Sequence, residues 1–134
     1  MNAKLSGPPA LAVVLFFLVA VPIFAHHGAA SYDTSKMTTL KGTVTNVEWI
    51  NPHAEIFIEV NDTAGQAQKY MVESISPLGL SRIGWTKDVL KPGDQVTVTG
   101  NLPKNGTHIL RLKKIILHNG KEFTIMSGED YSGQ

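Results

Sequence analysis

The sequence contains no cysteine, and its charges nearly balance, with 12 lysines and arginines against 11 aspartates and glutamates. Without cysteine the chain has no disulfide bond, no thiolate nucleophile and no cysteine-ligated metal site. A nearly neutral chain gives no electrostatic reason to expect nucleic acid or an anionic membrane as a partner. The sequence also lacks a glycine-rich phosphate loop and a serine-nucleophile signature. The chemistry left open is therefore a metal site built from histidine and carboxylate groups, or non-catalytic binding.

The amino terminus has the pattern of a secretory signal peptide over residues 1–25. Lys4 supplies the short positive region, an uncharged apolar run covers residues 10–23, and Ala25 ends a cleavage site. Removing these 25 of the 134 residues leaves 109, enough for one small domain with equal numbers of basic and acidic side chains. The sequence thus predicts a periplasmic or secreted protein with no membrane anchor after cleavage. A retained transmembrane anchor and cleavage after Ala30 are the alternatives.

The mature chain divides into three parts. Residues 26–36 show no periodicity and are expected to form an extended arm, residues 37–126 alternate like a β-sheet, and residues 127–134 are expected to be a flexible tail. The inward-facing parity changes inside two long strand segments, once between Val44 and Val47 and once across Lys113-Lys114. Such a change is what a β-bulge produces.

Local signals complete the fold prediction. Ser76 and Pro77 can begin a short helix that Gly84 ends, and Asn119-Gly120 predicts a tight hairpin. Trp49 and Trp85 are expected in the core. Three strands, a helix and two or three further strands, two of them long and bulged, favour an all-β fold: an OB-like coiled barrel of five to six strands, with one short helix after the third strand. An open sandwich is the alternative.

Five motifs occur together in the mature chain: adjacent histidines at its start, "LKGTV", "VEWINPH", "GW" and "LKPGD". With these motifs the chain resembles an exported bacterial family of unknown function, and the resemblance covers nearly all of the mature chain. It implies a periplasmic or secreted protein and leaves the activity open.

The residues point to a copper site. If cleavage follows Ala25, His26 carries a free α-amine beside its own imidazole, and the two groups can chelate one metal ion. A second imidazole, from His53 or from the adjacent His27, completes an all-nitrogen site that suits Cu(II) best. This local arrangement resembles the histidine brace of copper-dependent polysaccharide oxygenases and of some periplasmic copper carriers. Asp33 or Tyr32 can complete the coordination sphere, and Glu48 or Glu55 can orient an imidazole from outside it.

We therefore expect an exported, non-catalytic domain that binds Cu(II) through its terminal amine and histidines. The main alternative is an OB-like module that binds a small molecule, a glycan or a partner protein without metal. A copper oxygenase is a further alternative, although the sequence shows no aromatic strip for a polysaccharide and the domain is small.

Overall fold

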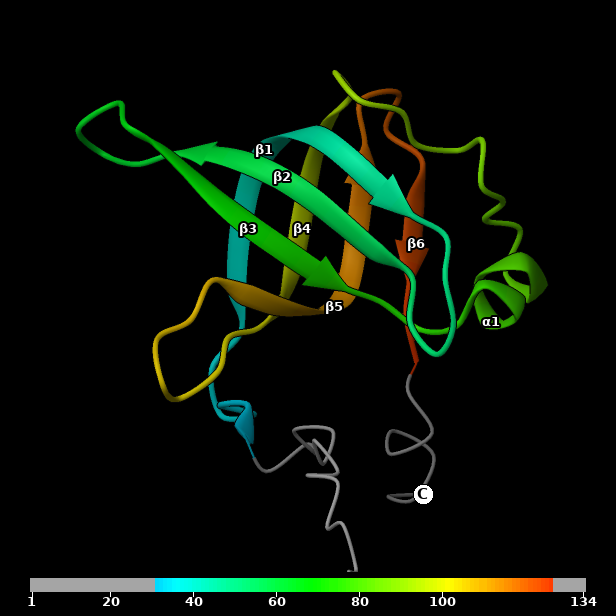
Figure 1. Ribbon diagram of the computed structural model, residues 1–134, viewed down its shortest axis with the longest axis horizontal. Helices are drawn as coiled ribbons and strands as arrows, with labels where there is room; N and C mark the ends of the chain where they lie inside the picture. The colour runs from blue at the N-terminus through cyan, green and yellow to red at the C-terminus, as the bar shows by residue number, and fades with distance from the viewer. Residues whose placement is uncertain (1–30, 127–134) are drawn as a thin grey trace, which may run out of the picture.

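A computed structural model describes residues 31–126 of the chain, and this part contains six strands and one short helix (Figure 1). The predicted signal peptide, the start of the predicted arm and the predicted tail lie outside the described residues. The elements in chain order are β1 (Thr38–Glu48), β2 (Glu55–Asn61), β3 (Ala67–Glu73), α1 (Pro77–Arg82), β4 (Gln95–Asn101), β5 (Ile109–Leu117) and β6 (Glu122–Thr124).

The strands form one sheet that closes into a barrel. Their order is β3-β2-β1-β4-β5-β6, and β3 also pairs with β5 in parallel, so the first five strands form a ring to which β6 adds an edge. All other strand pairs are antiparallel. With a helix between the third and fourth strands, this confirms the predicted OB-like barrel. The parallel β3–β5 pair excludes the open sandwich, because it joins the first strand of the sheet to the fifth and closes these five strands into a ring.

Both predicted bulges are present, and they bend the two longest strands. In β1 the pairing with β2 shifts register between Val44 and Asn46, and in β5 the pairing with β4 shifts between Lys114 and Leu112. Each extra residue turns the following side chains to the other face and increases the local coil of the strand. The first part of β1, Thr38–Thr43, pairs with β4 and its second part, Thr43–Glu48, pairs with β2, so one coiled strand connects two parts of the closed sheet.

Helix α1 is capped by the residue that the sequence predicts and is followed by the predicted glycine. The Ser76 side chain accepts a hydrogen bond from the Gly79 amide at 3.2 Å, and Pro77 occupies the first turn of α1. Gly84 follows the helix with φ of +81°, a conformation that favours glycine. Within residues 31–126 no helix is long and apolar enough to cross a membrane.

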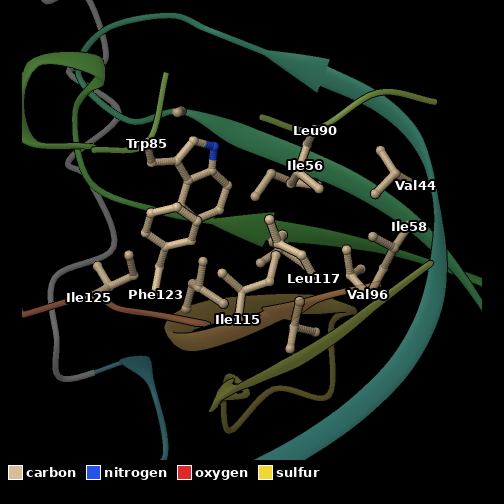
Figure 2. Close-up of a cluster of buried hydrophobic side chains, with 14 of the residues drawn as sticks. Val44, Ile56, Ile58, Trp85, Leu90, Val96, Ile115, Leu117, Phe123 and Ile125 are labelled. Carbon is tan, nitrogen blue, oxygen red and sulfur yellow. The ribbon is translucent and has the colours of Figure 1, made fainter. Parts of the chain in front are cut away.

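The barrel interior is a single apolar core, part of which is shown in Figure 2. Trp85 is 1% exposed and its ring lies 5.1 Å from that of Phe123, so the segment after α1 and strand β6 close one end together. This confirms the prediction for Trp85, whereas Trp49 is only partly buried against the core. The inward side chains of β2, such as Ile56 and Ile58, are 1% exposed, which places their neighbours in sequence on the outer face.

Candidate functional site

His53 lies in the connection between β1 and β2, with its side chain 41% exposed. Its Nδ1 is 3.3 Å from Oε1 of Glu73, the last residue of β3. Backbone hydrogen bonds extend the β2–β3 pairing beyond both strands, from Ala54 to Ile75 at 3.0 Å and from Ser74 to Ala54 at 2.9 Å. The imidazole is therefore held beside the end of β3 by main-chain geometry.

Glu73 has a second partner in the segment that precedes the barrel. Tyr32 is 7% exposed, its backbone forms a β-bridge with Pro103, and its phenol interacts with the Glu73 carboxylate. Burial raises the pKa of the Tyr32 phenol above its ordinary value of 10.0, and the Glu73 carboxylate raises it further while Arg111 opposes the shift. The Arg111 guanidinium lies 5.8 Å from the centre of the Tyr32 ring. Glu73 thus joins the start of the described chain to His53.

A row of carboxylates crosses three strands on the outer face. Glu48 of β1 is the pairing partner of Glu55 in β2, and Glu55 is the partner of Glu73 in β3. Burial raises the pKa of the Glu55 carboxyl, and the carboxylates of Glu48 and Glu73 raise it further, with His53 opposing them. The Glu48 carboxylate also accepts a hydrogen bond from the side-chain amide of Asn46 at 3.3 Å. This edge of the barrel is therefore negative, and His53 lies at its end.

The predicted site residues have different surroundings in the structure. His26 and His27 lie outside the described residues. Tyr32 joins the His53 cluster through Glu73, whereas the Asp33 carboxylate accepts hydrogen bonds from the Ser35 amide and hydroxyl at 3.1 and 2.6 Å. Those bonds lower the pKa of Asp33. Within residues 31–126, no three histidine, aspartate or glutamate side chains group together as a metal site. Of the three predicted metal ligands, His53 is the one that lies within the described residues.

Sequence reasoning missed Glu73, whose carboxylate lies beside His53 in addition to that of the predicted Glu55, on which His53 also acts. A signal was present, because β2 and β3 form a hairpin around the turn at residues 62–66. Counting outward from that turn pairs Glu73 with Glu55, two residues after His53. The hairpin register therefore identifies Glu73 as a carboxylate that lies beside His53.

Fold and site together define an OB-like barrel with a histidine, a tyrosine and a carboxylate linked at one edge. A family model matches residues 14–110, and its description is a family of unknown function, DUF6152. The match covers more than half of the chain, so the chain belongs to the DUF6152 family. The family assignment confirms the resemblance seen in the motifs.

Solved structures similar to this chain include two proteins. One is the crystal structure of the mitochondrial single-stranded DNA-binding protein Rim1 from S. cerevisiae, with 15% identity and a TM-score of 0.47, covering 62% of this chain and 94% of that one. The other is a ZRD-deleted mutant of TiaS in complex with agmatine, with 20% identity and a TM-score of 0.43, covering 72% of this chain and 23% of that one. A comparison with curated proteins gives no match.

Proposed function

We propose that this chain is an exported, non-catalytic domain of the periplasm or cell exterior that binds one Cu(II) ion. The ligands in this proposal are the α-amine and imidazole of His26, left at the front of the chain by cleavage after Ala25, and the imidazole of His53. Amine and imidazole nitrogens in this number suit Cu(II), the most tightly bound of the divalent first-row metals. That the chain binds no nucleic acid also remains a prediction.

The observation that supports this proposal is the contact between Tyr32 and His53 through Glu73. The phenol of Tyr32 interacts with the Glu73 carboxylate, and Oε1 of Glu73 lies 3.3 Å from Nδ1 of His53, so the chain enters the barrel close to the imidazole. His26 precedes Tyr32 by six residues, and an extended chain of that length spans at most about 20 Å. The terminal amine and His53 are therefore within reach of a common ion.

The contact with Glu73 also specifies how His53 would act. Nδ1 faces the carboxylate, so the proposal assigns Nε2 to the metal. Metal-binding histidines commonly donate their other ring N–H to a carboxylate, which fixes the ring and raises the basicity of the ligating nitrogen. Glu73 would supply this contact, and Tyr32 would hold the carboxylate in place from its other side.

The test is a Cu(II) titration of two versions of the mature protein that both start at His26, one with a free α-amine and one with that amine acetylated. Intact mass first establishes the leading residue and the acetyl group. Acetylation removes the amine from the chelate, so affinity should fall by more than the roughly 10- to 100-fold that accompanies loss of a ligand's hydrogen-bond partner. The His118→Ala variant is the control, because His118 is exposed beside the β5–β6 hairpin turn. Equal affinity of the two amino termini contradicts the proposal.

A further inference from the structure

A second feature lies on the outer face of β1, β2 and β3, where a groove encloses about 520 Å³. This volume falls in the range of small-molecule sites, about 300–1,000 Å³. The residues that matter for its chemistry are Asn46 and Glu48 from β1, Phe57 and Glu59 from β2, and Lys69 and Met71 from β3.

The centre of the groove is apolar. Phe57 lies between Ile56 and Ile58, which both point into the core, so its ring is on the outer face. Met71 is the direct pairing partner of Phe57 across the β2–β3 ladder. Both side chains are half-buried, and they form an adjacent pair that can take the flat or aliphatic body of a ligand.

The two ends of the groove differ in charge. At one end Glu59 and Lys69 are cross-strand partners, so a positive and a negative charge face each other. At the other end Glu48 lines the groove, and its cross-strand partner Glu55, which lies just beyond the lining residues, adds a second carboxylate. A ligand lying over Phe57 therefore has paired opposite charges at one end of the groove and carboxylates alone at the other end. The charge pattern favours a cation at the negative end.

From this pattern we propose that the groove binds a small amphipathic organic cation. Its apolar body lies on Phe57 and Met71, and its ammonium group lies at Glu48 and Glu55. Residues two apart on a strand are separated by about 6.7 Å, so the step from Phe57 to Glu55 fits a ring and an ammonium joined by a short linker. The site adjoins the proposed copper site, because Glu55 is the pairing partner of Glu73, but its ligands do not include His53 or the terminal amine.

The probe is the phenethylammonium ion, added to ¹⁵N-labelled mature protein in the presence of EDTA so that copper plays no part. Saturable shifts should appear at the backbone amides of Asn46, Phe57 and Met71. The Glu48→Gln variant keeps the shape of the side chain and removes its charge, and it should weaken binding by about tenfold, as expected for a hydrogen bond to a charged group. The Phe57→Leu variant, which keeps an apolar residue in place, should also bind more weakly.

The matched ligand is phenylacetate, which has a similar ring and linker and the opposite charge. It should give no saturable shifts at these three amides. The proposal is overturned if phenylacetate binds as well as phenethylammonium, if Glu48→Gln binds as tightly as the unmodified chain, or if saturation is centred on other residues. Absence of saturation at millimolar phenethylammonium overturns it as well.

Discussion

Oε1 of Glu73 lies 3.3 Å from Nδ1 of His53, although 20 residues of sequence separate them. The contact exists because β2 and β3 pair in a fixed register and continue this pairing through Ala54 and Ser74. The same carboxylate interacts with the phenol of Tyr32. One side chain thus links the entry of the chain, the end of β3 and the imidazole of the proposed copper site.

The first prediction concerns this carboxylate. The Glu73→Gln variant keeps the size of the side chain and removes the charge that faces Nδ1 of His53, so Cu(II) affinity should fall by about 10- to 100-fold. A competitive titration with a chelator of known affinity measures the change. Glu59→Gln is the matched control, because Glu59 is on the same outer face and pairs with Lys69. Equal losses in both variants would show a general effect of charge on copper binding and would remove the specific role of Glu73.

The second prediction concerns Gly100 in β4, which pairs with β5 beside the bulge. A Cβ at Gly100 would collide with the carbonyl oxygen of Arg111 and would lie 2.7 Å from Cδ2 of Leu110. Gly100→Ala should therefore lower the free energy of unfolding by about 3 kcal/mol, the upper end of the usual cost of overpacking. For a domain of this size, each kcal/mol lowers the melting temperature by roughly 4–8 °C.

The control for that variant is Gly65→Ala in the β2–β3 turn. A Cβ there meets nothing within 4 Å, and the cost comes from a φ of +80°, about 1 kcal/mol. Thermal melts of both variants, followed by circular dichroism, compare the two effects. If Gly100→Ala melts at or above the temperature of Gly65→Ala, β4 and β5 are not as close as the structure has them.

The third prediction is a pH dependence at the β2–β3 turn. Asp62 accepts hydrogen bonds from the amides of Ala64 and Gln66 at 2.9 and 2.8 Å and from the Gln68 side chain at 3.3 Å. These bonds favour the ionised form and lower the pKa of Asp62 below 3.8. Its contribution to stability is therefore present above the pKa of the unfolded chain and is lost as the pH falls through the folded pKa.

An NMR titration of the Asp62 carboxyl should give a midpoint below that of an aspartate in a short peptide. The Asp62→Ala variant should lose more stability at pH 6 than at a pH below the folded pKa, where the unmodified carboxyl is already protonated. Asp62→Asn retains an acceptor oxygen and should lie between the two. A midpoint at or above the peptide value would contradict the hydrogen bonds of this turn.

Features set by neighbouring residues were predictable from the sequence. The helix cap at Ser76, the hairpin at Asn119-Gly120 and the two bulges each depend on a few adjacent residues. The burial of Tyr32 was not predictable in this way, because it depends on a bridge to Pro103, which is distant in sequence. The role of Glu73 depended on the register of two strands. Local chemistry thus predicted the elements, while contacts across the barrel determined how the candidate site is assembled.

The most direct test of the copper proposal is the electron paramagnetic resonance spectrum of the Cu(II)-loaded mature protein, compared with that of its His53→Gln variant. Three nitrogen ligands are expected in the unmodified protein, namely the terminal amine, the imidazole of His26 and the imidazole of His53. The variant should lose the nitrogen hyperfine coupling of one imidazole, whereas His118→Gln should leave the spectrum unchanged. Identical spectra for the His53→Gln variant and the unmodified protein would contradict the assignment of His53 to the metal.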